Sequence, residues 1–157
     1  MSDRFSRTEL ILGRENLEKL WNSRVAVFGI GGVGSYTAEA LARAGIGALD
    51  LIDRDVVDVT NINRQLIASQ STIGRAKVEV MKERILDMDP AVRVTAHKCF
   101  FLPDTEFNLT HYDYIVDAID TVSAKIELIV RAEREGIPVI SSMGTGNKLD
   151  PTAFEVE

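Results

Sequence analysis

Residues 25–34 of this 157-residue chain, VAVFGIGGVG, decide its fold. The run from Val25 to Phe28 is apolar and contains β-branched residues, which is typical of a strand buried on both faces of a parallel sheet. It leads directly into a glycine-rich turn, and residues 35–44 follow with good helix formers. A strand, a glycine turn and a helix in this order predict the first unit of a doubly wound α/β sheet.

Further strands and helices alternate along the chain. The spacing of Val78, Met81 and Ile85 predicts an amphipathic helix, and Gly45, Pro90 and Gly136 are the predicted helix ends. Strands that alternate with helices imply a Rossmann-like, mostly parallel sheet with helices on both faces. We expect strands at residues 48–52, 93–99, 114–118 and 138–142, and helices at residues 35–44, 75–88 and 122–135.

Short elements are expected at both ends of the chain. Ser6-Arg7-Thr8-Glu9 has the pattern of a capping box, so a helix should start near Arg7. Gly13 interrupts it, and a second helix is expected at residues 15–21. Residues 150–152 are predicted to turn and residues 153–157 to begin a strand. We expect one truncated domain over residues 1–157, with N-terminal helices at 6–22 and a Rossmann-like core at 24–157.

Composition limits the classes of function. The chain has 18 basic and 24 acidic residues, and a net charge of -6 argues against a stand-alone nucleic-acid binder. Its single cysteine, Cys99, excludes an internal disulfide and a four-cysteine zinc site, and is expected in the core on the third strand. Because no apolar run resembles a signal peptide or a membrane span, we expect a cytoplasmic protein without membrane contact.

The glycine turn and Asp53 together predict a nucleotide site. Gly29, Gly31 and Gly34 have the G-x-G-x-x-G spacing, which lets phosphate approach the backbone closely at a helix N-terminus. Asp53 is expected at the end of the second strand, where a carboxylate accepts hydrogen bonds from ribose hydroxyls. The alternative is a glycine turn kept only for tight packing. These residues do not distinguish NAD from ATP.

Polar side chains beyond the second strand favour phosphate chemistry. Asn61, Arg64 and Gln65 form a cluster in which the guanidinium of Arg64 can grip phosphate oxygens. Lys77 stands early in a predicted helix, where a cation opposes the helix dipole at a cost of about 0.3–1 kcal/mol unless an anion binds there. The alternative is a solvated loop, and for Arg75 we prefer simple exposure to solvent.

Two carboxylates, Asp117 and Asp120, are expected at the carboxyl end of the fourth strand. Ligands of open α/β sheets bind at that edge. A carboxylate that faces a triphosphate is a natural Mg²⁺ ligand, and we expect this role for Asp120 and a structural role for Asp117. The alternative is that Asp120 or Thr121 only caps the next helix.

The combined motifs resemble those of the E1-like activating enzymes over nearly the whole chain. This resemblance implies adenylation of a carboxylate, with ATP and Mg²⁺ as cofactors. Arg64 and Lys77 would then take the phosphate charge, and Asp120 would serve the metal. Arg7 matches an arginine that reaches into the partner's ATP site in family dimers, which implies a homodimer. The residues implied for ATP binding are Gly29, Gly31, Gly32, Gly34, Asp53, Asp55, Asn61 and Gln65.

Within this superfamily, Asp117–Asp120 and residues 142–152, SMGTGNKLDPT, resemble the branch that dehydrates threonylcarbamoyladenosine in tRNA. The resemblance implies that the carboxylate of a modified adenosine becomes an acyl-adenylate. A hydroxyl of the nucleoside then displaces AMP, so that a cyclic ester closes. The expected substrate is therefore tRNA. The net charge of -6 fits RNA poorly, so the tRNA-contacting part is expected beyond residue 157.

Other functions stay open. An activator of a ubiquitin-like sulfur-carrier protein would adenylate a C-terminal glycine, and paired C-x-x-C motifs in a further C-terminal half would favour it. A NAD-dependent dehydrogenase would use the glycine turn and Asp53, but it gives no role to Arg64, Lys77 or Asp120. A third alternative is a nucleotide-binding scaffold without catalysis.

Overall fold

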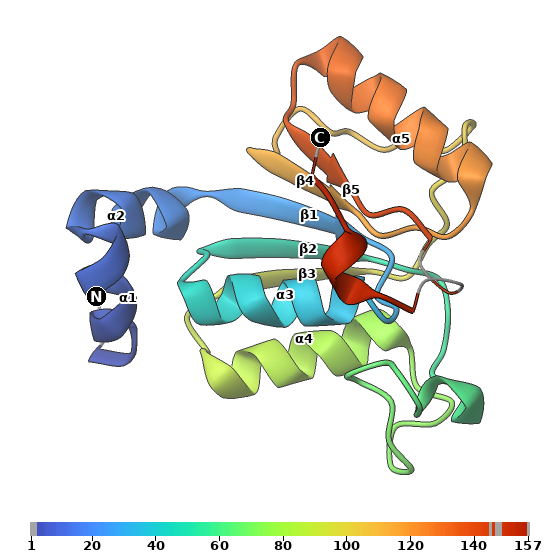
Figure 1. The fold of residues 1–157 in the computed structure, drawn as a ribbon, viewed down its shortest axis with the longest axis horizontal. Helices are drawn as coiled ribbons and strands as arrows, with labels where there is room; N and C mark the ends of the chain where they lie inside the picture. Colours follow the sequence, from blue (N-terminus) through green and yellow to red (C-terminus); the bar gives the residue numbers. More distant parts are fainter. Residues whose placement is uncertain (1–2, 145, 147–148, 157) are drawn as a thin grey trace.

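The computed structural model describes residues 3–144, 146 and 149–156 (Figure 1). In these residues, five strands form one sheet in the order β3-β2-β1-β4-β5. All four pairings between neighbouring strands are parallel, which confirms the predicted Rossmann-like α/β fold. The strands are β1 (Arg24–Phe28), β2 (Ala48–Ile52), β3 (Arg93–His97), β4 (Tyr114–Asp117) and β5 (Val139–Ser141).

Helices cover both faces of the sheet (Figure 1). On one face, α3 (Gly34–Ala44) and α4 (Lys77–Met88) enclose the larger core with β1 and β2. On the other face, α5 (Val122–Glu135) and residues 98–113 enclose a second core around Phe28. Both faces of the central strands are therefore buried, as parallel strands require. Among the described helices, none is long and apolar enough to cross a membrane.

Two short helices, α1 (Ser6–Leu12) and α2 (Arg14–Asn22), precede the sheet after a 3-10 turn at Asp3–Phe5. The predicted capping box at Ser6 is wrong, because Phe5 occupies the N-cap position and no side chain caps the helix. The chain is already wound before Ser6, which therefore lies inside the first helical turn. Phe5 is buried close to Gly45, so it holds these helices against the sheet domain.

Two predicted elements are longer than those in the structure: the strand at residues 93–99 and the helix at residues 75–88. The backbone N–H of Cys99 bonds to the carbonyl oxygen of His97 at 2.9 Å, so the chain turns where β3 ends. Cys99 lies beyond the strand and is half-buried at the edge of the second core, which corrects its predicted place. Arg75 precedes α4, because residues 74–76 run beside residues 55–57 through a bridge between Val56 and Ala76.

The predicted strand at residues 153–157 is also wrong. Pro151–Ala153 form a 3-10 turn, with proline at its start, where it fits well. Asp150 caps this turn by accepting hydrogen bonds from the backbone N–H and the hydroxyl of Thr152. Val156 is 89% exposed, and residues 154–156 pair with no strand of the described part of the chain. Thr145, Asn147 and Lys148 of the SMGTGNKLDPT stretch, and Glu157, lie outside the described residues.

A buried ionic cluster lies at the centre of β2. Asp50 is 1% exposed and accepts two hydrogen bonds from Arg24, at 3.0 and 2.8 Å. The hydroxyl of Tyr112 donates to it at 2.9 Å, and Nε2 of His97 lies 2.8 Å away. Burial acts to raise the pKa of Asp50, but these hydrogen bonds, that of Arg24 foremost, hold it below its ordinary value. The cluster joins β1, β2, β3 and the segment before β4.

Replacing Asp50 tests this cluster. We expect Asp50→Asn to lower the free energy of unfolding at neutral pH by about 2–3 kcal/mol, because it leaves buried donors without their charged acceptor. The pKa of Asp50 is lower in the folded than in the unfolded chain, so its contribution is present above its ordinary value of 3.8 and is lost as the pH falls. Urea unfolding at neutral and acidic pH measures both effects, with exposed Asp104→Asn as the control; equal stability of the two variants would contradict the expectation.

Candidate nucleotide-binding site

The glycine turn occupies the carboxyl edge of the sheet, between the ends of two neighbouring strands. Phe28, the last residue of β1, pairs with Ile52 of β2 and with Asp117 of β4. Beyond it, the N–H of Gly29 donates to the carbonyl oxygen of Ile52 at 2.8 Å, and the N–H of Ala118 donates to that of Phe28 at 2.8 Å. Side chains that follow β2 and β4 therefore meet beside this turn.

The glycines of the turn divide into two pairs. Gly29 has a φ of +88°, and a Cβ at Gly34 would lie 1.7 Å from the carbonyl oxygen of Gly29, so both are required by the fold. A Cβ at Gly31 would meet only Nε2 of Gln65, at 3.8 Å, and one at Gly32 only Arg64, at 3.6 Å or more. Packing does not require glycine at Gly31 and Gly32. The absence of side chains there leaves the backbone open to close approach of a ligand.

Asp53 connects this turn to a buried lysine. Its Oδ2 accepts a hydrogen bond from the N–H of Ile30 at 2.7 Å, and its Oδ1 accepts one from the N–H of Asp55 at 2.8 Å. The carboxylate of Asp55 lies 3.1 Å from Nζ of Lys77, which is 6% exposed at the start of α4. A continuous line of contacts thus joins the glycine turn, Asp53, Asp55 and Lys77, which lie far apart along the sequence.

Gln65 carries an unpaired buried atom next to the glycine turn. The residue is 7% exposed, and its Oε1 is a buried side-chain atom without a hydrogen-bond partner in the described part of the chain. Its other terminal atom, Nε2, faces Gly31. An unpaired buried acceptor costs about 1–3 kcal/mol, so such an atom calls for a partner. The side chain therefore keeps an acceptor available for a hydrogen-bond donor next to the glycine turn.

Two other residues of the same segment differ in their roles. Arg64 is exposed beside Gly32, and its guanidinium donates to the carbonyl oxygen of Thr60 and to Oδ1 of Asn63, so it is held over the turn. Asn61 is buried, and its Oδ1 accepts the N–H of Asp58 in a capping box of the 3-10 turn at Val59–Asn61. The side-chain oxygen of Asn61 therefore stabilises the local turn.

Sequence reasoning missed the contribution of Lys125. This side chain is 7% exposed on α5, and its Nζ donates to Oδ2 of Asp117 at 2.8 Å, to Oγ of Ser141 at 3.1 Å and to the carbonyl oxygen of Ser142 at 2.9 Å. Asp117 is fully buried and also accepts from the N–H of Ile119 at 3.0 Å. The structural role expected for Asp117 agrees with this network. The ion pair fixes the loop between β4 and α5.

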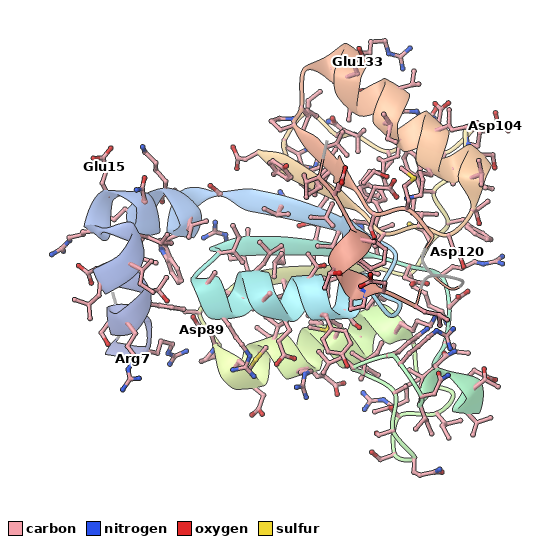
Figure 2. The ribbon with its side chains drawn as sticks, in the orientation of Figure 1. Arg7, Glu15, Asp89, Asp104, Asp120 and Glu133 are labelled. Carbon is pink, nitrogen blue, oxygen red and sulfur yellow. The ribbon has the colours of Figure 1, made fainter. Side chains whose placement is uncertain are left out.

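That loop carries Asp120, which is exposed at the same edge of the sheet (Figure 2). Thr121 is the N-cap of α5, but no side chain makes a capping hydrogen bond there, which argues against the capping alternative. The described residues contain no group of three or more potential His, Cys, Asp or Glu ligands. Asp120 fits Mg²⁺, because Mg²⁺ is commonly held by one or two carboxylates together with phosphate oxygens and water.

Arg7 lies apart from all these residues. It is exposed on α1, and Figure 2 shows it at the opposite end of the molecule from Asp120. Its own chain therefore does not bring it to the glycine turn. A role for Arg7 at this site requires a second copy of the chain.

The sheet, the glycine turn and the side chains around it together define the class of protein. A doubly wound sheet whose glycine turn is faced by a carboxylate and by cations has the organisation of a nucleotide-binding domain. The chain belongs to the ThiF family, whose family model matches residues 5–157. The predicted resemblance to the E1-like enzymes, in their tRNA-modifying branch, is thereby confirmed.

Two relatives show how far the similarity extends. The tRNA threonylcarbamoyladenosine dehydratase of Bacillus subtilis is 51% identical over 158 residues, which cover 99% of this chain and 62% of that protein. Two solved structures of the Escherichia coli tRNA N6-threonylcarbamoyladenosine dehydratase, in complex with ATP and with AMP, have TM-scores of 0.90 and 0.92. Both are 45% identical and match 96% of this chain, but 65% and 64% of theirs. This chain thus spans less than two thirds of the length of these relatives.

The two pairs of glycines make a testable contrast. We expect Gly34→Ala to lower the free energy of unfolding by more than about 2 kcal/mol, because the new Cβ collides with backbone that has no room to move. Gly31→Ala, whose Cβ meets only ordinary contacts, should unfold within about 1 kcal/mol of the wild type. Thermal and urea unfolding compare the two variants, and similar losses in both would show that the turn is not packed as described.

Proposed function

We propose that residues 1–157 act as the ATP-binding adenylation domain of an enzyme that cyclises threonylcarbamoyladenosine in tRNA. The observation that carries this proposal is Lys77, buried and joined through Asp55 and Asp53 to the glycine turn. A lysine placed there neutralises phosphate charge. The relatives named as dehydratases of this nucleoside, one of them in complex with ATP, support the same substrate.

The binding roles follow from the positions of the side chains. Asp53 accepts hydrogen bonds from ribose hydroxyls at the end of β2, and the backbone at Gly31 and Gly32 lets the phosphates approach the N-terminus of α3. Arg64 and Lys77 supply positive charge around the phosphates. Oε1 of Gln65 accepts a hydrogen bond from the bound molecule, which satisfies its unpaired buried atom.

Adenylation of a carboxylate depends more on stabilising negative charge than on acid–base catalysis. A carboxylate oxygen of the nucleoside attacks the α-phosphorus of ATP, the bond from that phosphorus to the bridging oxygen breaks, and pyrophosphate leaves. Arg64 and Lys77 stabilise the negative charge that develops on the phosphoryl oxygens. Mg²⁺ bound by Asp120 and phosphate oxygens would neutralise charge on the leaving pyrophosphate. An internal nucleophile of the same nucleoside then displaces AMP and closes the ring.

Other functions fit the chain less well. An activator of a sulfur-carrier protein would share the first step, and identity of 51% to a tRNA-modifying relative favours the nucleoside as acceptor. A dehydrogenase has no use for the line of contacts that ends at Lys77. We place the enzyme in the cytoplasm, where tRNA is available as the substrate.

The metal and the phosphate cation are tested by calorimetric titration with Mg·ATP. We expect Lys77→Ala to weaken binding at least tenfold, because it removes a buried cation facing phosphate, and Asp120→Ala to abolish the gain in affinity that Mg²⁺ provides. Lys98→Ala, an exposed lysine beyond β3, should bind like the wild type. Wild-type ATP affinity in Lys77→Ala would refute the phosphate-binding role of Lys77. If the wild-type chain bound NAD but not ATP, a dehydrogenase would become the favoured function.

We further propose a homodimer in which Arg7 completes the partner's site. Leu10 and Ile11, on the same short helix as Arg7, are 86% and 84% exposed. Neighbouring apolar side chains this exposed are typical of an interaction surface. A two-fold interface would deliver each Arg7 to the other copy, so that both sites become equivalent.

Mixed dimers test the assignment of Arg7. When equal amounts of Arg7→Ala and Lys77→Ala dimers exchange subunits, half of the resulting dimers contain one chain of each kind. Each mixed dimer has one intact site, formed by Lys77 of one chain and Arg7 of the other. About one site in four should therefore regain wild-type ATP affinity. A mixture of Arg64→Ala and Lys77→Ala should regain none, because both residues belong to the site of their own chain. Calorimetric stoichiometry measures the recovered sites, and no recovery in the first mixture would contradict action in trans.

A further inference from the structure

Lys125 is a buried cation that has no part in the binding roles of the other cations at the site. Its side chain is 7% exposed, and a lysine is almost never buried this far unless it is paired. Its Nζ donates three hydrogen bonds, and the acceptors lie outside its own helix α5, on Asp117, Ser141 and Ser142. An ammonium group has three protons, so all of them are used to connect other segments.

The first of these segments is the loop after β4, which carries Asp120. The N–H of Ile119 donates to Oδ1 of Asp117 at 3.0 Å, and the backbone N–H of Lys125 donates to the carbonyl oxygen of Thr121 at 3.0 Å. In the described part of the chain, the side chain of Asp120 accepts only a long hydrogen bond, from the hydroxyl of Thr121 at 3.4 Å. The place of this carboxylate is therefore set by the backbone of its loop.

The second segment is the end of β5 and the residue after it. The N–H of Ser142 donates to the carbonyl oxygen of Asp117 at 2.9 Å, and its own carbonyl oxygen accepts from Nζ of Lys125 at 2.9 Å. The hydroxyl of Ser141 donates to Oδ2 of Asp117 at 2.6 Å. Both backbone groups of Ser142 are thus bound to this ion pair, which holds the loop after β4 and the end of β5 as one unit.

Stability alone does not account for an ion pair at this place. Removing two charges from water costs much of what their attraction returns, and apolar residues of similar volume often stabilise a core equally well. An apolar pair cannot, however, direct the hydrogen-bonding groups around it. Groups that orient a metal ligand from behind typically change metal affinity about 10- to 100-fold when they are removed.

We propose that Lys125 is a positioning residue that, through Asp117, sets the place of Asp120 for the Mg²⁺ that accompanies ATP. This step rests on the proposed function, in which Asp120 serves the metal. In this role Lys125 contacts neither the nucleotide nor the metal. It holds the loop after β4 against the end of β5, so that Asp120 is already in place when the phosphates bind.

The functional test measures the gain in ATP affinity that Mg²⁺ provides, by calorimetric titration of the 157-residue chain with and without the metal. Lys125→Met keeps the length of the side chain and removes its charge. It should reduce this gain at least about tenfold and leave the affinity for metal-free ATP within about twofold. Lys125→Arg keeps the charge and should retain most of the gain.

Arg24→Met is the matched control. It also deprives a buried carboxylate, that of Asp50, of its cation, but in the middle of the sheet and away from the carboxyl edge. This variant should be destabilised and should nevertheless keep the full gain from Mg²⁺. An equal loss of the gain in Arg24→Met and Lys125→Met would overturn the proposal, because the effect would then follow from lost stability.

Hydrogen exchange without metal or nucleotide tests the positioning by itself. In Lys125→Met, the amides of Ile119 and Ser142 should exchange faster together, by at least about tenfold, because both donate to Asp117, which has lost its charged partner. Acceleration at only one of the two amides would show that the segments are not held as one unit, and would overturn the proposal.

A double variant keeps the test decisive if Lys125→Met does not fold. Asp117→Leu combined with Lys125→Met leaves no unpaired buried charge, so it should fold and still lack the gain from Mg²⁺. A wild-type gain in this double variant, or in Lys125→Met itself, overturns the positioning role and leaves the proposed function intact. A wild-type chain that binds ATP equally well with and without Mg²⁺ overturns the role of Asp120 and the positioning role together.

Discussion

The close approach of Gly34 to the carbonyl oxygen of Gly29 is the constraint on which the rest of the structure depends. No side chain fits between the end of β1 and the start of α3, so the helix begins directly over the strand end. Gly29 in turn lies against the carbonyl oxygen of Ala118, which brings the loop after β4 to the same edge. The ends of β2 and β4 can then flank the turn, and the N-terminus of α3 faces the space between them.

Two buried carboxylates hold this framework, and they do so at different places. Asp50 lies in the middle of the sheet and is neutralised by Arg24 of a neighbouring strand. Asp117 lies at the carboxyl edge and is neutralised by Lys125 of the helix that follows. A buried charge is costly unless it is paired and hydrogen-bonded. Each carboxylate therefore constrains its surroundings, the first the packing of strands and the second the loop that carries Asp120.

Several cations are gathered at the site although the chain as a whole is acidic. The net charge is -6, yet Arg64 and Lys77 stand near the glycine turn, and Arg54 directly follows Asp53. Asp55 balances Lys77 and Arg54 without enclosing them. This distribution fits an anionic ligand that lies across the ends of β1, β2 and β3.

The sequence alone determined most strands and helices, the glycine turn and the positions of Asp53, Lys77 and Asp120, because periodicity, helix ends and glycine spacing are local properties. It did not reveal that Lys125 neutralises Asp117, that Tyr112 bonds Asp50, or that Arg54 stacks on Phe100. It also predicted a capping box at Ser6 and a strand at residues 153–157, where the fold has neither. Only the tertiary structure decides such features. A contact between residues far apart along the chain leaves no local sequence pattern. A capping box needs a free helix start, and a strand needs a neighbouring strand to pair with, and neither is present at these positions.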